Sequence, residues 1–296
     1  MAGAYVKVGS GDHHVLALHG WFGSALGWGH LPEYLNTTDF SYVFTDLRGY
    51  GSRKGEAGQY TMAEAAADAI GLADALGWER FSLIGHSMSG VAVQHVLLQA
   101  PRRVRRLVGV APVPASGLPL GESDWALFSQ AAASRENRAV IVNFSTGNRL
   151  PAAFIDGIVG HSLDNSDPAA FRGYLESWAR ADIAGQVKGA EVPVKVITGE
   201  NDPSQPAEFM EQTWLQIYPN SELEVLRGSG HYPMFETPAT LAASIEEFLS
   251  RDKSSKQLKT GKPTCYIRAI PLKEAPGGHG RAKSAREPRR GFSGRR

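Results

Sequence analysis

The fold is decided by one stretch, Phe81-Ser82-Leu83-Ile84-Gly85-His86-Ser87-Met88-Ser89-Gly90. Its apolar first half is typical of a buried strand, and its second half predicts a sharp turn into a helix. A β-carbon at Gly85, or a side chain at Ser89 larger than hydroxymethyl, would collide with a neighbouring strand or helix. The stretch therefore predicts a nucleophile elbow, a strained turn that holds the Ser87 hydroxyl above a sheet.

The elbow departs from its usual form at one position. The pattern G-x-S-x-G requires glycine at position 89, where this chain has Ser89 followed by Gly90. An ordinary strand-to-helix turn with a capping serine is the alternative interpretation. The remainder of the chain has to decide between the two.

Further apolar segments on both sides of the elbow predict strands. They lie at residues 4–8, 14–18, 42–47, 107–111, 194–198 and 222–226. Helices are predicted after the capping box Thr61-Met62-Ala63-Glu64, after the elbow and after Thr237-Pro238. Strands that alternate with helices, several of them apolar on both faces, predict an α/β fold whose mostly parallel sheet has helices on both faces.

The strand pattern lapses between residues 112 and 190, where helical segments replace it. We predict a core of residues 1–111 and 191–250 and a helical cap insertion of residues 112–190. An insertion after the strand at 107–111 would lie over the carboxyl edge of the sheet, where ligands bind. Candidate pocket residues are the aromatic side chains Phe22, Trp125, Phe128, Phe154 and Trp178. The alternative is that the cap aromatics only pack the insertion onto the core.

Composition indicates a soluble globular chain of 296 residues, 42% hydrophobic and 9% aromatic. The single cysteine, Cys265, excludes an intrachain disulfide and a cysteine-based metal site. The other histidines show no metal-ligand spacing, so we expect no metal. No apolar run approaches a membrane span and the N-terminus lacks a signal-peptide layout, so we expect a cytoplasmic protein that binds no membrane.

Charge divides the chain into an acidic body and a basic tail. Residues 251–296 hold 14 of the 31 Lys and Arg but 3 of the 30 Asp and Glu, a net charge of +11. The 17 basic and 27 acidic residues that remain give the body a net charge of −10. The tail has no apolar period and predicts disorder. Nucleic-acid binding by the tail is the weaker hypothesis beside a solvated or adventitious extension, because the tail lacks interleaved aromatics.

A serine nucleophile needs a base, and the base needs a carboxylate to hold its tautomer. In a sheet of this kind both follow the serine, each on a loop after a later strand. Asp202, in Gly199-Glu200-Asn201-Asp202-Pro203, and His231, between small residues in Gly228-Ser229-Gly230-His231, occupy such loops. We expect His86 to be a hydrogen-bonding residue of the elbow, and Asp46 to fix a loop.

Serine attack on a carbonyl produces an oxyanion that requires backbone donors already in place. One is the N–H of Met88, at the start of the helix after the elbow. The second is predicted to be the N–H of Trp21, in the loop His19-Gly20-Trp21 after the strand at 14–18.

These segments resemble, in their order, the motifs of the α/β-hydrolase superfamily, and the branch of serine esterases and cofactor-free haloperoxidases (perhydrolases) in particular. The resemblance covers about residues 4–250, with Ser52-Arg53 and Ser89 as departures that we expect to narrow the site. It implies a cofactor-free serine hydrolase that cleaves a small-molecule carboxylic ester through an acyl-enzyme. The elbow serine argues against epoxide hydrolase and haloalkane dehalogenase activity, which use aspartate there. Hydrolysis of carbon–carbon bonds, peracid formation and a non-catalytic ligand receptor remain alternatives. The sequence does not indicate an oligomeric state.

Overall fold

The computed structural model of the protein describes residues 5–251. The predicted basic tail therefore lies outside the described residues except for Arg251. The guanidinium of Arg251 donates to Glu222 at 2.5 Å and to Glu247 at 2.9 Å, so this residue belongs to the folded body.

The centre of the protein is a sheet that contains seven strands within the described residues, in the order β1-β3-β2-β4-β5-β6-β7. Its neighbouring strands are parallel except for β1 and β3, which are antiparallel. The central strands are buried along their whole length, which explains their continuous apolar sequence. The predicted α/β class with a mostly parallel sheet is confirmed. The strands are β1 (Tyr5–Gly9), β2 (His13–Leu18), β3 (Phe40–Thr45), β4 (Phe81–His86), β5 (Val104–Val110), β6 (Val194–Gly199) and β7 (Ser221–Leu226).

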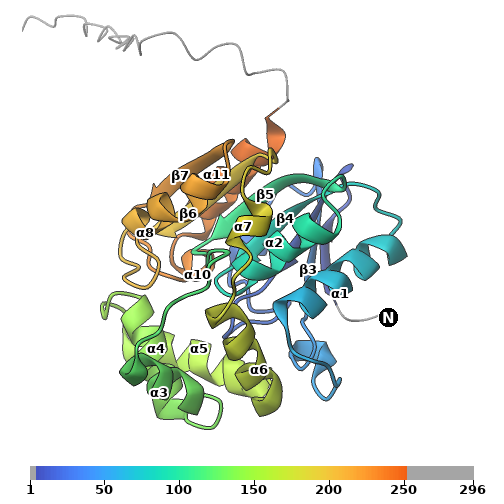
Figure 1. Ribbon diagram of the computed structural model, residues 1–296. Helices are drawn as coiled ribbons and strands as arrows, with labels where there is room; N and C mark the ends of the chain where they lie inside the picture. Colours follow the sequence, from blue (N-terminus) through green and yellow to red (C-terminus); the bar gives the residue numbers. More distant parts are fainter. Residues whose placement is uncertain (1–4, 252–296) are drawn as a thin grey trace, which may run out of the picture. The chain divides into compact units, whose positions relative to one another are not determined.

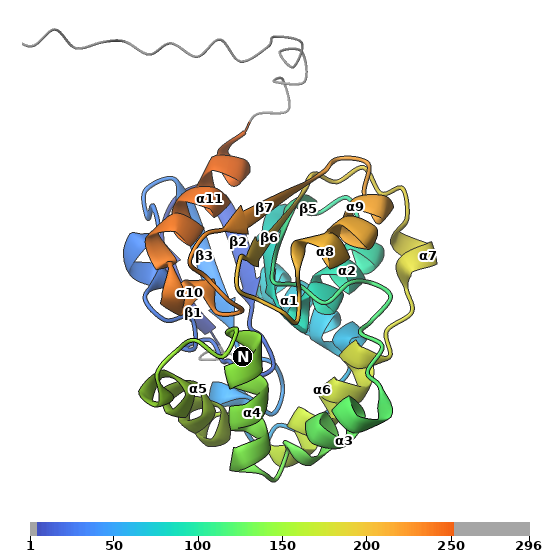
Figure 2. The same cartoon turned by 90° about the vertical axis from the view of Figure 1, so that its left-hand side faces the viewer.

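Helices cover both faces of the sheet (Figure 2). One side carries α1, α2, α8 and α9, and the other carries α11, which packs on the 3-10 helix η1. The core helices are α1 (Met62–Ala75), α2 (Ser89–Gln99), α7 (Ala184–Val187), α8 (Ala207–Gln212), α9 (Trp214–Ile217), α10 (Pro233–Glu236) and α11 (Pro238–Ser250), with 3-10 helices η1 (Leu31–Tyr34) and η2 (Gly51–Arg53).

Four helices between β5 and β6 form a separate group beside one edge of the sheet (Figure 1). They are α3 (Glu122–Gln130), α4 (Arg135–Ser145), α5 (Ala152–Asp164) and α6 (Pro168–Ala179). Their starts follow local chemistry: the Ser134 hydroxyl caps α4 by accepting from the Asn137 N–H at 3.1 Å, and α6 begins with Pro168. These helices occupy the segment predicted as a cap.

The predicted capping box at α1 is half formed. Thr61 accepts a hydrogen bond from the Glu64 N–H at 3.1 Å, as the pattern requires. The Glu64 carboxylate does not return to Thr61 but accepts from the N–H groups of Gln59 and Tyr60, both at 2.9 Å. The helix start is thus stabilised together with the loop that precedes it.

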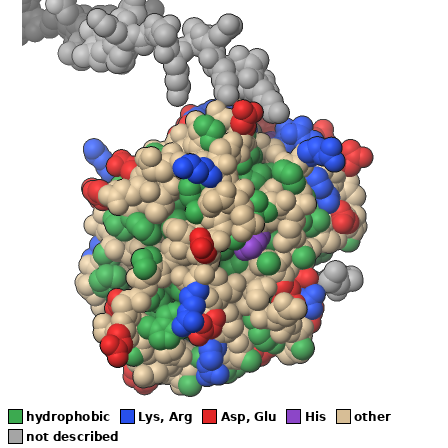
Figure 3. Space-filling model, viewed as in Figure 1, with side chains coloured by type: hydrophobic (Ala, Val, Ile, Leu, Met, Phe, Trp, Pro, Cys, Tyr) green, Lys and Arg blue, Asp and Glu red, His purple; other side chains and the backbone are tan. Residues whose placement is uncertain are grey.

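Charged side chains of both signs are interspersed over the face seen in Figure 3, without a continuous basic patch on that face of the described residues. None of the helices described between residues 5 and 251 combines the length and the apolar character that crossing a membrane requires.

Candidate active site

Ser87 follows β4 directly and has a backbone conformation that strains an L-amino acid. Its φ is +53°, and α2 begins two residues later at Ser89. A non-glycine residue in this region costs on the order of 1–3 kcal/mol, so neighbouring contacts must hold it. The Ser87 N–H donates to the Val110 carbonyl at 3.0 Å, and the Gly90 and Val113 N–H groups donate to the Ser87 carbonyl at 2.9 Å. These contacts hold the geometry expected of an elbow.

The small residues beside Ser87 meet different needs. A Cβ at Gly85 would lie 2.6 Å from the Ser89 carbonyl oxygen and 2.9 Å from Val93 Cγ2, so glycine is required there. Ser89 is fully buried, and its hydroxyl donates to the His19 carbonyl at 2.5 Å. Ser89 was expected to narrow the site, but it does not line the cavity described below. It joins the elbow to the loop after β2.

Ser87, His231 and Asp202 come together at the carboxyl edge of the sheet, from the loops after β4, β7 and β6. His231 Nε2 lies 2.9 Å from Ser87 Oγ, and His231 Nδ1 lies 2.6 Å from Asp202 Oδ2. A carboxylate only accepts hydrogen bonds, so Nδ1 carries the proton and Nε2 presents its lone pair to the serine. The His231 N–H donates to the Ser145 carbonyl at 3.1 Å, which fixes the histidine loop to the cap.

The Asp202 carboxylate is buried and fully bonded. Its Oδ1 accepts from the Ser204 N–H at 2.9 Å, the Ser204 hydroxyl at 2.5 Å and the Gln205 N–H at 3.2 Å. Hydrogen bonds to a charged acceptor are strong, so this turn fixes the carboxylate that faces His231. Glu200, the neighbouring acid in the sequence, instead accepts from the Gly228 N–H at 3.0 Å.

His86 has the hydrogen-bonding position expected of it. Its Nε2 donates to the His231 carbonyl at 2.9 Å, so it supports the backbone of the histidine loop. Burial, reinforced by the nearby His231, lowers the pKa of His86 to about 3. The ring is therefore neutral at physiological pH and orients its neighbour without adding charge to the site.

The loop after β2 lies against the elbow. A Cβ at Gly20 would lie 2.5 Å from His86 Nδ1 and 3.2 Å from Ser87 Cβ, so only glycine permits this approach. The N–H groups of Trp21 and Met88 were predicted to bind an oxyanion. Within residues 5–251 neither donates to a protein acceptor. Both are therefore available to bind an oxygen atom of a ligand beside Ser87.

Trp21 is held by contacts with both the core and the cap. Its carbonyl accepts from the Tyr50 hydroxyl at 3.0 Å, and its indole N–H donates to the Phe171 carbonyl at 2.8 Å. Its ring stacks on Phe171 with 3.9 Å between the ring centroids. The orientation of this loop therefore depends on α6 of the cap as well as on β2.

Asp46 fixes a loop, as the sequence indicated. Its carboxylate accepts from the Ala25 N–H at 2.7 Å, the Ser52 N–H at 2.9 Å and the Ser52 hydroxyl at 2.8 Å. It therefore joins the loops after β2 and β3. Gly51 has a φ of +50°, and a Cβ there would clash with the Asp46 carboxylate.

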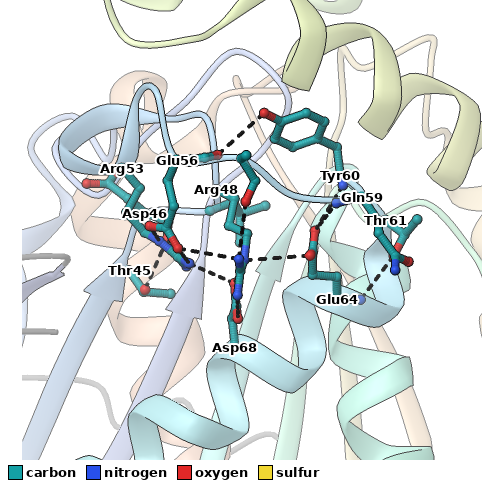
Figure 4. Close-up of polar contacts among 12 residues, drawn as sticks. Thr45, Asp46, Arg48, Arg53, Glu56, Gln59, Tyr60, Thr61, Glu64 and Asp68 are labelled. Carbon is teal, nitrogen blue, oxygen red and sulfur yellow. Dashed lines mark hydrogen bonds and ion pairs between the residues drawn. The ribbon is translucent and has the colours of Figure 1, made fainter.

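The loop after β3 is tied to α1 by two arginines (Figure 4). Arg48 and Arg53 both donate to Asp68, at 2.8 and 2.9 Å, and Arg53 also forms two 2.7 Å bonds with Glu56. Ser52-Arg53 was expected to narrow the site. Neither residue lines the cavity, because Ser52 binds Asp46 and the guanidinium of Arg53 faces Glu56 and α1.

A cavity of about 370 Å³ opens above Ser87 and His231, between the sheet edge and the cap. Three of the predicted pocket aromatics, Phe22, Phe128 and Trp178, line it, and so does the Trp21 side chain. Most of its remaining walls are aliphatic and aromatic side chains, namely Val113, Leu118, Leu120, Leu127, Val140, Ile141, Phe144 and Tyr232.

Two of the predicted pocket residues do not line this cavity. Trp125 stacks under the Arg180 guanidinium, 4.4 Å from the ring centroid, in a second depression on the cap surface. Phe154 packs edge-on against Tyr232 and Phe235, at 6.4 and 6.1 Å between ring centroids. Both lie on cap helices, but each turns its ring toward another neighbour.

The sequence did not single out Ser204, Ser145 or Gln205, which also line the cavity. Ser204 had a detectable signal, because Asp-x-Ser is a common turn in which the carboxylate accepts from the residue two positions later. Gln205 and Ser145 carried no such signal, since their exposure to the cavity depends on the position of the cap.

The sheet order, the strained elbow and the position of the cap define the protein as an α/β-hydrolase fold. A sequence profile of the alpha/beta hydrolase family matches residues 15–244. The chain belongs to this family of hydrolases.

Two curated proteins and one solved structure illustrate the similarity. The chain is 24% identical to 3-oxoadipate enol-lactonase 2 of Acinetobacter baylyi, over 83% of this chain and 92% of that protein. It is 23% identical to the pimeloyl-[acyl-carrier protein] methyl ester esterase of Serratia marcescens, over 82% and 96% of the two chains. The bromoperoxidase structure from Bacillus anthracis superposes with a TM-score of 0.75 at 18% identity, over 83% and 95% of the chains, which establishes a shared fold.

Proposed function

We propose that this protein is a carboxylesterase-type serine hydrolase that cleaves small-molecule carboxylic esters through an acyl-enzyme. The observation that carries the proposal is the continuous contact from Asp202 through His231 to Ser87, at 2.6 and 2.9 Å. Nucleophile, base and orienting carboxylate are all within hydrogen-bonding distance before any substrate is bound.

In the first half of the reaction, His231 Nε2 takes the proton of the Ser87 hydroxyl as Oγ attacks the ester carbonyl carbon. The protonated ring is stabilised by Asp202, whose charge is held in place by Ser204. The carbonyl oxygen becomes an oxyanion, which the N–H groups of Trp21 and Met88 would bind. His231 then returns the proton to the departing alcohol, leaving an ester between Ser87 and the acyl group.

The second half repeats this chemistry with water. His231 takes a proton from a water molecule, which attacks the acyl-enzyme carbonyl, and the same two N–H groups bind the new oxyanion. Collapse of this intermediate returns the proton to Ser87 and releases the carboxylic acid. Every step uses side chains and backbone groups of this chain, so the proposal requires no cofactor.

Two further observations favour esters as the substrate class. The relatives named above are an enol-lactonase and a methyl ester esterase. The cavity beside Ser87 is mostly apolar, which suits the hydrocarbon part of an ester better than a highly charged substrate. Serine at position 87 also argues against an alkyl-enzyme mechanism, which in this superfamily uses aspartate at the elbow.

The test is hydrolysis of 4-nitrophenyl butanoate by the full-length protein and by Ser87→Ala. We expect the substitution to lower kcat by at least about a thousandfold, because the nucleophile is lost. The folded state should persist, as measured by circular dichroism. Ser129→Ala, a cap serine whose hydroxyl binds only the Ala126 carbonyl of its own helix, is the matched control and should retain activity. Turnover retained by Ser87→Ala would refute the assignment of the nucleophile.

A further inference from the structure

Gln205 is a polar residue of the cavity that the catalytic proposal does not use. It follows Asp202 by three residues, is 2% exposed and lines the same cavity as Ser87 and His231. Its backbone is fixed on both sides, because its N–H donates to Asp202 Oδ1 at 3.2 Å and its carbonyl accepts from the Thr198 hydroxyl. The starting position of its side chain is therefore set by the loop that carries the catalytic acid.

The side-chain amide of Gln205 lacks a protein partner at its oxygen. Oε1 is buried, and no hydrogen bond to it is formed within the described residues. A buried polar atom without a partner destabilises the folded protein, whereas a leucine of similar size would not. Placed against a mostly apolar cavity, such an amide is suited to bind a polar group that enters with the substrate.

A second residue of the same cavity has a similar unpaired group. The indole Nε1 of Trp178 is also buried without a partner among the described residues. The other unpaired buried side-chain atoms in the described part of the chain belong to residues outside the cavity, namely Trp28, Tyr174, Trp214 and Thr237. The cavity thus contains hydrogen-bonding capacity besides the triad and the proposed oxyanion donors.

We infer that Gln205 is a specificity-determining residue that binds a hydroxyl or amide group of the substrate, so that polar-substituted esters are preferred over hydrocarbon esters of the same shape. This inference rests on the proposed esterase function. An amide both donates and accepts, and rotation about the Cγ–Cδ bond exchanges its two ends. A hydroxyl group, which also does both, matches either orientation.

The test uses pairs of esters in which a hydroxyl replaces a methyl group. The acyl arm compares methyl 3-hydroxybutanoate with methyl 3-methylbutanoate, and the alcohol arm compares 2-hydroxyethyl butanoate with propyl butanoate. Hydrolysis is followed by titration of the released acid, and kcat/KM is determined for each ester. In at least one arm, the wild-type protein should prefer the hydroxyl ester by about three- to tenfold, the range expected of one hydrogen bond.

Gln205→Leu should abolish this preference, bringing the ratio of the two kcat/KM values to about one or below, because only the polar contact is lost. Gln205→Met, an unbranched side chain of similar length, replaces it if the leucine variant does not fold. Gln216→Leu makes the same chemical change at an exposed position, where the amide binds the Glu211 carbonyl, and should leave the ratio unchanged.

Two results would overturn the inference while leaving the esterase proposal intact. One is a wild-type protein that hydrolyses both members of each pair without a preference for the hydroxyl ester. The other is a preference that Gln205→Leu and Gln205→Met retain in full. A wild-type protein that hydrolyses none of the four esters would overturn the proposed function, and this inference with it.

Discussion

Ser89 Oγ lies 2.5 Å from the carbonyl oxygen of His19, a contact between residues 70 positions apart. A glycine at position 89, as the G-x-S-x-G pattern has, would not form this bond. His19 is followed by Gly20, whose Cα faces Ser87, and by Trp21, the proposed oxyanion donor. The hydroxyl of Ser89 therefore fixes the distance between the nucleophile and the loop that must stabilise the charge.

Ser89→Ala should weaken both stability and catalysis. The His19 carbonyl would lose its donor while remaining buried, which costs about 1–3 kcal/mol of unfolding free energy. The Trp21 loop would be less firmly held, so we expect kcat for 4-nitrophenyl butanoate to fall about tenfold, with a smaller change in KM, because a displaced donor weakens transition-state binding. Chemical denaturation and steady-state kinetics measure the two effects.

Ser89→Gly tests the same contact by restoring the residue that the pattern prefers. It should show the same loss of kcat, since the hydroxyl and not the side-chain volume carries the effect. Full activity in both variants would show that the hydrogen bond to His19 does not position the oxyanion loop.

The cap should depend on a buried arginine. Arg138 is 1% exposed, donates to the Ala131 carbonyl at 2.8 Å and to the Ser162 hydroxyl at 2.6 Å, and lies 3.8 Å from the centroid of the Phe171 ring. Arg138→Met would leave these acceptors buried without a donor and remove the cation–π contact. We expect a loss of about 2–4 kcal/mol in unfolding free energy.

Arg135→Met is the matched control for this substitution. Arg135 forms an exposed ion pair with Asp156 at 2.9 Å, and exposed pairs contribute at most about 1 kcal/mol. Because the Phe171 ring stacks on Trp21, Arg138→Met should also lower activity, whereas Arg135→Met should not. Equal stability of the two variants in urea would contradict the proposed role of Arg138.

Stability should fall as the solution is acidified below pH 6.5. Burial lowers the pKa of His86 to about 3 and that of His13 to about 4, so the unfolded chain binds protons at a higher pH than the folded protein. The neutral rings leave the stability intact above pH 6.5, and it is lost as the pH falls toward these folded-state values. Each histidine contributes at most about 1.4 kcal/mol per pH unit within this window.

The contribution of His86 can be separated by comparing His86→Gln with His30→Gln, a change at an exposed histidine. Urea unfolding at several pH values between 7 and 4.5 should show a shallower dependence in His86→Gln and an unchanged one in His30→Gln. A wild-type protein equally stable at both ends of this range would disprove the prediction.

The sequence was sufficient for the features that depend on local pattern. The strand ending at His86 is apolar because both faces of the central sheet are covered, and the small residues around Ser87 reflect the close approach of α2. The order of Ser87, Asp202 and His231 along the chain was also informative, since the carboxyl ends of parallel strands meet at one edge. Their geometry agrees with these expectations, although their chemical roles remain proposals.

Features that depend on packing between distant segments were not predictable in the same way. Trp125 and Phe154 lie on the same kind of amphipathic helix as Phe128, and only the position of each helix decides which ring faces the cavity. The function of the Ser89 hydroxyl depends on the course of the loop at His19, which no local pattern specifies. The same is true of Gln205, whose unpaired amide is apparent only once its surroundings are known.

The central claim is that Ser87 is the nucleophile, and covalent labelling tests it most directly. Diethyl 4-nitrophenyl phosphate transfers its diethylphosphoryl group to an activated serine and releases 4-nitrophenol, and the product resists hydrolysis. After reaction with the full-length protein, peptide mass spectrometry should find one diethylphosphoryl group, on Ser87, and none in a His231→Ala variant, which lacks the base. Labelling of another residue, or equal labelling of Ser87 without His231, would contradict the account.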